Sequence, residues 1–316
     1  MKPSLLITRP LPEAVHAAAE ARFAVTRRES SLPMSDAELR AALQAHDAVL
    51  PTLGDRFTAE IFATAPHRAR ILANFGVGYN HIDVGAAKAA GITVTNTPGA
   101  VTDATADIAL TLILMTARRA GEGERLLRAG QWQGWHPVQM LGTHVSGKRV
   151  GIIGMGRIGQ AIARRCHFGF GMEVAFYNRS PLADLGFPAR QVPLAEALSA
   201  DFVVLAVPGG AATHHLIGAA ALAAMTPHTI LINISRGDVV DETALITALQ
   251  SGQIAGAGLD VYEFEPKVPD ALRAMENVTL LPHLGTAALE VRTAMGLMAV
   301  ENLTAFFDGR DPPNRL

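Results

Sequence analysis

A glycine-rich turn near the middle of the chain constrains the fold more than any other feature. Residues 150–153 form a short apolar run, residues 154–159 read Gly-Met-Gly-Arg-Ile-Gly, and the chain then takes a helical composition. This order predicts a buried strand, a turn and a helix. Gly154 permits a tight turn, Gly156 has no Cβ and leaves the backbone open to a ligand, and Gly159 lets the helix lie close to the strand.

The same spacing, GxGxxG, is typical of turns that bind a dinucleotide, whose pyrophosphate sits on free N–H groups at a helix start. Spacing alone is weak evidence in a chain with 29 glycines, and an ordinary glycine turn is the alternative. A second predicted strand, residues 172–177, ends roughly 20 residues beyond the last glycine, where a ribose-reading residue belongs. We therefore predict a dinucleotide cofactor, with Arg157 and Ile158 of the turn among its contacts.

The residues after that second strand bear on the choice of dinucleotide. A site for NAD places Asp or Glu here, and the carboxylate repels a 2′-phosphate. This chain has Asn178, followed by Arg179, which can fork onto a phosphate, and Ser180, which can donate to it. A plain polar turn is the alternative. We predict that NADPH (cofactor NADP) is preferred and that NAD is a second cofactor.

Charge and cysteine content exclude several other classes of protein. The chain has 27 Lys and Arg against 29 Asp and Glu, so nothing indicates nucleic acid or an anionic membrane as a partner. No apolar run approaches the ~18 residues of a membrane span. The single cysteine, Cys166, excludes an internal disulfide framework and is expected to be a buried, inert thiol in a reducing compartment. We expect a cytoplasmic protein with a small-molecule partner.

Strand-like apolar runs alternate with Ala-rich helical stretches along the chain, which predicts an α/β fold with doubly wound parallel sheets. At 316 residues, two domains are expected. Ser35 and Glu38 have the spacing of a capping box, residues 103–119 read as a helix, and residues 121–143 as an arm or surface loop. Strands are expected at residues 5–8, 23–26, 48–50, 71–74, 92–95, 150–153, 174–177, 202–207, 230–234, 258–261 and 278–281.

The last six of these strands match the number in a full Rossmann sheet. Residues 286–307 are expected to form one long amphipathic helix. Residues 142–148 have P-loop spacing, but Arg149 stands where Ser or Thr must bind magnesium. No metal site is expected either, because His214 and His215 are adjacent and cannot face one metal from the same side of a regular element.

Three polar residues follow predicted strands, at the edge where a Rossmann sheet binds its ligand. They are Arg236, Glu265 and His283. Arg236 offers a planar fork for a substrate carboxylate, and His283 can protonate a carbonyl oxygen as hydride arrives. A carboxylate such as Glu265 beside the imidazole would hold the ring and favour its protonated form. Each residue alone has a structural alternative, namely a surface cation, a loop carboxylate and a core histidine.

Several long motifs of the chain resemble the D-isomer-specific 2-hydroxyacid dehydrogenase family. They are residues 74–83 (Asn-Phe-Gly-Val-Gly-Tyr-Asn-His-Ile-Asp), 97–99 (Thr-Pro-Gly), 233–242 (Asn-Ile-Ser-Arg-Gly-Asp-Val-Val-Asp-Glu), 259–266 (Leu-Asp-Val-Tyr-Glu-Phe-Glu-Pro) and 282–283 (Pro-His). The resemblance covers nearly the whole chain. Within the family, the chain is most similar to glyoxylate/hydroxypyruvate reductases.

This resemblance implies a Rossmann cofactor domain, residues 99–285, inserted in a flavodoxin-like substrate-binding domain, residues 1–98 and 286–316. It implies that Arg236 binds the substrate carboxylate with the backbone of Val77 and Gly78, and that Glu265 pairs with the acid/base His283. The cofactor contacts that it implies are Thr105, Gly154, Gly156, Arg157, Ile158, Gly159, Asn178, Arg179, Ser180, Val207, Pro208, Thr213, Ile234, Asp260, His283 and Gly285.

The resemblance further implies reduction of small 2-oxo acids to D-2-hydroxy acids. Residues 132–140 match an arm that crosses a dimer interface in relatives, so a homodimer is expected. Gln139 stands where some hydroxypyruvate reductases have tryptophan, so the resemblance does not decide which 2-oxo acid is preferred. A D-lactate or phenylpyruvate-type reductase is one alternative, and a non-catalytic, dinucleotide-sensing protein similar to corepressors is another.

Overall fold

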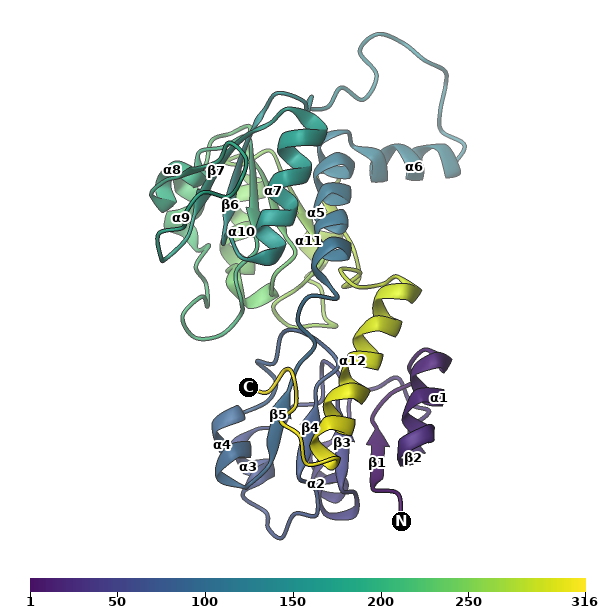
Figure 1. The fold of residues 1–316 in the computed structure, drawn as a ribbon. Helices are drawn as coiled ribbons and strands as arrows, with labels where there is room; N and C mark the ends of the chain where they lie inside the picture. Colours follow the sequence, from purple (N-terminus) through teal and green to yellow (C-terminus); the bar gives the residue numbers. More distant parts are fainter. The chain divides into compact units, whose positions relative to one another are not determined.

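The computed structural model describes residues 1–316 as two compact units, Met1–Val101 with Ala287–Leu316 and Thr102–Thr286. Each unit is built on one parallel sheet with helices on both faces (Figure 1). The predicted α/β class with two doubly wound sheets is therefore confirmed.

The sheet of the first unit has five parallel strands in the order β2-β1-β3-β4-β5, which is the flavodoxin-like order. Its three central strands are apolar and almost wholly buried, as expected for parallel strands that helices cover on both faces. The strands are β1 (Ser4–Ile7), β2 (Ala24–Arg27), β3 (Ala48–Leu50), β4 (Ile71–Ala73) and β5 (Thr93–Thr95).

Successive residues of these strands point to opposite faces and build two separate cores. Leu5 and Ile7 pack with helices α1 (Glu13–Arg22) and α12 (Leu289–Phe307), whereas Leu6 packs on the other face. Figure 1 shows α1 and α12 side by side, and their close approach requires Gly296, where a Cβ would lie 2.4 Å from Val15. The opposite face carries α2 (Asp36–Ala45), α3 (Ala59–Phe62) and α4 (Val84–Ala89).

The predicted capping box is present at the start of α2. The Ser35 hydroxyl accepts from the Glu38 N–H at 3.4 Å, and the Glu38 carboxylate accepts from the Ser35 N–H at 2.7 Å. Two N–H groups that the first turn leaves unpaired are thereby satisfied.

The sheet of the second unit has seven parallel strands in the order β12-β11-β10-β9-β6-β7-β8. This is the Rossmann order with one further strand, β12, at the edge. The expected count of six was wrong, because β8 has only two exposed residues and no apolar pattern. The strands are β6 (Arg149–Ile153), β7 (Glu173–Tyr177), β8 (Arg190–Gln191), β9 (Phe202–Leu205), β10 (Ile230–Asn233), β11 (Gly256–Leu259) and β12 (Val278–Leu280).

Helices cover both faces of this sheet. One face packs against α5 (Thr102–Ala117) and α7 (Arg157–Phe170), which lie side by side in Figure 1. The other face carries four short helices. These are α8 (Leu194–Leu198), α9 (Ala219–Ala223), α10 (Glu242–Gln250) and α11 (Asp270–Ala274).

The segment expected to be an arm or surface loop begins with a helix, α6 (Ala120–Arg128). Gly121 and Gly123 obscured it in the sequence, because glycine disfavours a helix interior. An ion pair between Arg119 and Glu122 at 2.7 Å supports its first turn. After α6 the chain is irregular as far as β6.

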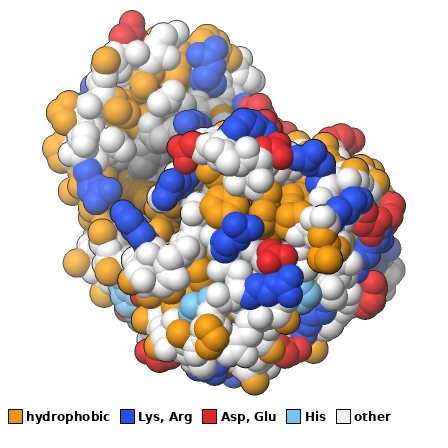
Figure 2. Space-filling view, turned by 60° about the horizontal axis from the view of Figure 1, so that its bottom comes forward, with side chains coloured by type: hydrophobic (Ala, Val, Ile, Leu, Met, Phe, Trp, Pro, Cys, Tyr) orange, Lys and Arg blue, Asp and Glu red, His pale blue; other side chains and the backbone are white.

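Basic and acidic side chains are mixed on the surface, as expected from their nearly equal numbers in the sequence. Lys and Arg side chains are interspersed with Asp and Glu on the visible face, with no large area of one sign (Figure 2). None of the helices combines the length and apolar character needed to cross a bilayer. Cys166 is fully buried as expected, and this burial raises the pKa of its thiol to about 12, which disfavours the reactive thiolate.

Candidate active site

The glycine turn lies where the strand order of the second sheet reverses, between β6 and β9. Gly154 has a φ of +98°, and a Cβ there would lie 2.6 Å from the Ala206 carbonyl oxygen. At Gly159 a Cβ would lie 2.1 Å from the carbonyl oxygen of Gly154, so α7 packs directly on the turn. At Gly156 a Cβ would meet no atom within 4 Å. The predicted strand, turn and helix are confirmed, and the space beside Gly156 fits a phosphate at the helix start.

Asn178, Arg179 and Ser180 follow β7 as predicted. The Asn178 side-chain oxygen accepts weakly from the Met155 N–H of the glycine turn at 3.4 Å, and its amide donates to the Ser180 carbonyl at 3.0 Å. Gln191 donates to the carbonyls of Asn178 and Ser180, both at 3.1 Å. Arg179 and Ser180 are exposed to solvent. Asn178, which is uncharged and bonded to the glycine turn, is therefore followed by the accessible guanidinium of Arg179.

Asp260 organises the turn that carries His283. The Asp260 carboxylate accepts from the N–H groups of Leu284 at 2.6 Å and Gly285 at 2.8 Å, and its carbonyl accepts from the His283 N–H at 2.9 Å. Burial raises the pKa of Asp260 above its ordinary value, although these N–H groups favour the charged form. Thr105 on α5 donates to the Gly285 carbonyl at 3.2 Å. These bonds hold His283 at a φ of +55°, a conformation that few non-glycine residues adopt.

The other predicted cofactor residues of this unit lie after β9, after β10 and at the start of α7. Val207 and Pro208 lie in the loop after β9, and the Thr213 hydroxyl donates to the Pro208 carbonyl at 2.7 Å. Ile234 is buried at the end of β10. Arg157 is exposed and Ile158 is partly buried at the start of α7.

Arg236 follows β10 in a turn that Asn233 fixes. The Asn233 side chain donates to the Arg236 carbonyl at 2.9 Å and accepts from the Ser235 N–H at 3.0 Å. The Arg236 guanidinium is half-buried and donates to the Ser235 carbonyl at 2.7 Å. Burial lowers the pKa of Arg236, while the carboxylates of Glu265 and Asp238 oppose that shift.

His283 and Glu265 are joined by a hydrogen bond of 2.9 Å between Nδ1 and Oε2. Burial alone would raise the pKa of Glu265, but the hydrogen bond and charge of His283, the Tyr262 N–H and the charge of Arg236 together bring that pKa below its ordinary value. Glu265 is therefore an ionised acceptor, and the Nδ1–H of His283 must be the donor. The three predicted catalytic residues of this unit, Arg236, Glu265 and His283, therefore interact with one another and form a charged group.

Sequence reasoning missed several residues that shape this group. Tyr262 donates from its hydroxyl to the Leu281 carbonyl at 2.9 Å and ties the β11 loop to the β12 loop. At Gly237 a Cβ would lie 1.8 Å from the Tyr262 carbonyl carbon, so the Arg236 turn packs directly on that loop. Glu242 is buried and accepts from the Glu263 N–H at 3.0 Å. The signal in the sequence was their place in the motifs 233–242 and 259–266, which contain Gly237, Glu242 and Tyr262.

In the first unit, Val77 and Gly78 lie in the loop after β4. The carbonyl of Val77 accepts from Asn96 at 2.9 Å, and the carbonyl of Gly78 accepts from Asn74 at 3.1 Å. The Asn74 side-chain oxygen also accepts from Nε2 of the His81 ring at 3.0 Å. Side-chain amides therefore hold the carbonyl groups of this loop and fix its backbone.

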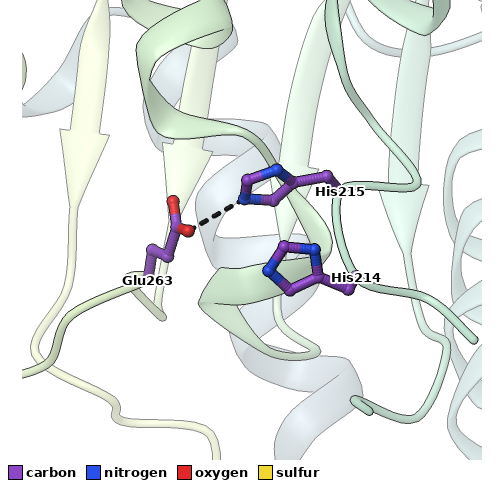
Figure 3. A group of neighbouring side chains, drawn as sticks. All are labelled: His214, His215 and Glu263. Atoms are coloured by element: carbon purple, nitrogen blue, oxygen red, sulfur yellow. Dashed lines mark hydrogen bonds and ion pairs between the residues drawn. The ribbon is translucent and has the colours of Figure 1, made fainter. Parts of the chain in front are cut away.

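The expectation about His214 and His215 was wrong in its premise. They lie outside any helix or strand, and His215 has a φ of +51°. This left-handed residue turns both rings to the same side, where they stack with centroids 3.9 Å apart. His215 Nε2 lies 2.8 Å from Glu263 Oε1 (Figure 3).

The second unit combines a doubly wound sheet, an open glycine turn at its reversal point, and a guanidinium and a carboxylate–imidazole pair after other strands of the same sheet. This combination is typical of dehydrogenases that use a nicotinamide dinucleotide. Comparisons with known proteins give the family. Residues 110–285 match the model of the D-isomer specific 2-hydroxyacid dehydrogenase, NAD binding domain. The chain belongs to the D-isomer specific 2-hydroxyacid dehydrogenase family, as the sequence motifs indicated.

Several relatives are similar over nearly their whole length. The chain is 46% identical to a glyoxylate reductase of Thermococcus gammatolerans, over 99% of this chain and 95% of the relative. It is 45% identical to the glyoxylate reductase of Pyrococcus furiosus, with the same coverage. Among solved structures, an NADPH-dependent glyoxylate/hydroxypyruvate reductase from Sinorhizobium meliloti, in complex with NADP and malonate, has a TM-score of 0.89 and 37% identity, over 100% of this chain and 97% of the other. The chain is thus an NAD(P)-dependent oxidoreductase.

Proposed function

We propose that this enzyme reduces small 2-oxo acids, glyoxylate and hydroxypyruvate first among them, to D-2-hydroxy acids and prefers NADPH. The observation that carries the proposal is the His283–Glu265 pair at 2.9 Å, which interacts with the charge of Arg236. A proton donor next to a fixed cation suits a substrate that has a carboxylate beside a carbonyl group. The names of the relatives support the choice of glyoxylate and hydroxypyruvate.

In this proposal Arg236 grips the substrate carboxylate with its planar guanidinium. The turn that Asn233 fixes supports this role, because it holds the backbone from which the guanidinium extends. In the first unit, Val77 and Gly78 are proposed to bind substrate through their backbone N–H groups. The carbonyl groups of both residues accept hydrogen bonds from asparagine side chains, which fix the loop. A fixed loop can keep its N–H groups oriented toward an anion, and this supports the proposed role.

His283 donates the proton to the substrate carbonyl oxygen. Because Nδ1 donates to Glu265, the other ring nitrogen, Nε2, is the one that can reach substrate. The ionised Glu265 stabilises the imidazolium and holds the ring in place. When bound, the reduced nicotinamide supplies the hydride.

Cofactor preference rests on the residues after β7. Asn178 cannot repel a 2′-phosphate as a carboxylate would, and the exposed Arg179 and Ser180 can bind one. The space beside Gly156 and the start of α7 suit the pyrophosphate. The remaining predicted contacts of the cofactor are Thr105, Gly154, Arg157, Ile158, Gly159, Val207, Pro208, Thr213, Ile234, Asp260, His283 and Gly285.

Assembly and location complete the proposal. Trp132, Trp135, Val138 and Leu141 are all exposed in the segment after α6, and such a concentration of apolar side chains suits a protein interface. We propose that this arm joins two copies in a homodimer. A cytoplasmic location fits the single, buried cysteine.

A screen of 2-oxo acids against NADPH and NADH tests the function. The expected result is the highest kcat/KM with glyoxylate or hydroxypyruvate and NADPH. A higher kcat/KM with pyruvate or phenylpyruvate would favour the D-lactate or phenylpyruvate-type reductase. Dinucleotide binding without turnover of any acid would contradict the proposal and favour the sensing protein.

A further inference from the structure

Three side chains outside the charged group place metal-binding atoms close together. His214 and His215 each offer an imidazole nitrogen and Glu263 a carboxylate oxygen, and these atoms all lie within 4.8 Å of one another. The two rings are nearly parallel, with an interplanar angle of 26°. In Figure 3 each ring turns a nitrogen toward the side on which the Glu263 carboxylate lies.

The backbone holds this arrangement in place. The left-handed conformation of His215 is costly for a residue with a side chain, and persists where surrounding contacts enforce it. The His215 N–H donates to the Asp238 carbonyl at 2.8 Å, and the Ile217 N–H donates to the Val239 carbonyl at 3.0 Å. The strained residue is therefore fixed on both sides, and adjacent histidines share one face because of it.

The local charge favours a cation. The Glu263 side chain is only 13% exposed and pairs with His215, and its N–H is bound by the buried carboxyl of Glu242. Glu265 lies two residues further along the same loop. A largely buried carboxylate needs compensation by hydrogen bonds or by a cation.

We propose that His214, His215 and Glu263 bind a divalent transition-metal ion, with zinc as the probe, and that water fills the remaining coordination positions. Imidazole nitrogens suit Zn²⁺, Cu²⁺ and Ni²⁺, whereas Mg²⁺ and Ca²⁺ prefer oxygen ligands alone. With metal–ligand bonds of about 2.1 Å, an ion can join atoms up to about 4.2 Å apart. The exposed His214 has the freedom to move the remaining distance.

An ion at this site would connect two loops of the second unit. His214 and His215 belong to the segment after β9, and Glu263 belongs to the loop after β11. The first segment also packs on the Arg236 turn, since a Cβ at Gly209 would lie 2.7 Å from Arg236 Cγ. Zinc should therefore stiffen this region and raise the Tm. The inference does not depend on the identity of the substrate.

Calorimetric titration of the untagged full chain with zinc chloride, after EDTA treatment and dialysis at neutral pH, tests the site. We expect one ion per chain, bound more weakly on acidification because imidazole must be deprotonated to coordinate. His214→Ala removes one ligand from an exposed position and should weaken zinc binding by about tenfold or more. Glu263→Gln removes the charged ligand and should weaken binding further.

Two histidine variants serve as matched controls. His228→Ala removes an exposed histidine that lies 3.5 Å from Asp201, and His283→Ala removes the histidine that is bonded to Glu265. Both should bind zinc like the wild type. The proposal is overturned if the wild type binds no zinc, if His214→Ala binds as tightly as the wild type, or if His283→Ala is the variant that loses the ion. A zinc-induced rise in Tm that His214→Ala lacks, with an unchanged circular dichroism spectrum, would support it independently.

Discussion

The imidazole of His283 donates from Nδ1 to the Glu265 carboxylate at 2.9 Å, and this bond joins the loop after β12 to the loop after β11. It depends on a backbone that Asp260 holds in the left-handed region at His283. The proposed acid is therefore oriented twice, once through its ring and once through its main chain. Oriented proton donors of this kind are what general acid catalysis requires.

If His283 delivers the proton, His283→Ala should lower kcat by about 10²–10⁴-fold, the range for loss of a general acid. Cofactor affinity should change much less. Steady-state kinetics with NADPH and glyoxylate, together with a fluorescence titration of NADPH, separates the two effects. His228→Ala is the matched control, and a His283→Ala enzyme with nearly wild-type kcat would refute the assignment.

Glu265→Gln should shift the pH profile of reduction to lower pH. The wild-type carboxylate stays ionised because its interactions with His283, Tyr262 and Arg236 outweigh burial and hold its pKa below the ordinary value. A neutral amide removes this charge from the pair, so the contribution of the pair to the pH profile should change. The measurement is kcat/KM against pH for both enzymes, and superimposable profiles would rule out a role for the pair.

Arg236→Lys should raise KM for 2-oxo acids about tenfold or more, while NADPH affinity changes little. The compact ammonium of lysine cannot reproduce two parallel hydrogen bonds to a carboxylate. Arg310→Lys, at an exposed position of the first unit, is the control. Equal loss of substrate and cofactor binding in Arg236→Lys would instead mark Arg236 as a cofactor or folding residue.

We expect Asp47, in the first unit, to make the free energy of unfolding decrease as the pH becomes acidic. Its pKa is held well below the ordinary value by hydrogen bonds from Arg68 and from the N–H and hydroxyl of Ser4, at 3.0, 2.7 and 2.8 Å. A lowered pKa stabilises the fold above the unfolded-state value of about 4, and this stabilisation is lost as the pH falls toward the folded-state pKa.

Asp47→Asn should therefore cost about 1–2 kcal/mol of unfolding free energy at pH 7, because Asp47 is partly exposed and its interactions are partly screened. The difference from wild type should shrink steadily below about pH 4. Urea unfolding at several pH values measures both effects. Glu173→Gln, at an exposed position, should change stability by less than about 0.5 kcal/mol. A difference that is constant with pH would show that the charge of Asp47 is not responsible.

Most of the fold and the charged group could be predicted because apolar runs mark buried parallel strands, and polar residues after them meet at one edge of a sheet. What escaped prediction depends on backbone conformation or on distant packing. The strand β8 has no apolar residues, and α6 contains two glycines. The side chains of His214 and His215 lie on one side only because the backbone of His215 is in the left-handed conformation. No local sequence pattern predicts that conformation.

The exposed Arg179 gives the sharpest test of cofactor preference. A charge-assisted contact with a 2′-phosphate at an exposed position is worth about 1.5–3 kcal/mol, so Arg179→Ala should weaken NADPH binding by about 10- to 100-fold and leave NADH nearly unchanged. Asn178→Asp combined with Arg179→Ala should reverse the preference, because the new carboxylate repels the phosphate and accepts from the ribose hydroxyls. Fluorescence titration with both cofactors measures the affinities, and Arg190→Ala on β8 controls for loss of an exposed arginine. The hypothesis fails if the wild type binds NADH as tightly as NADPH, or if Arg179→Ala weakens both alike.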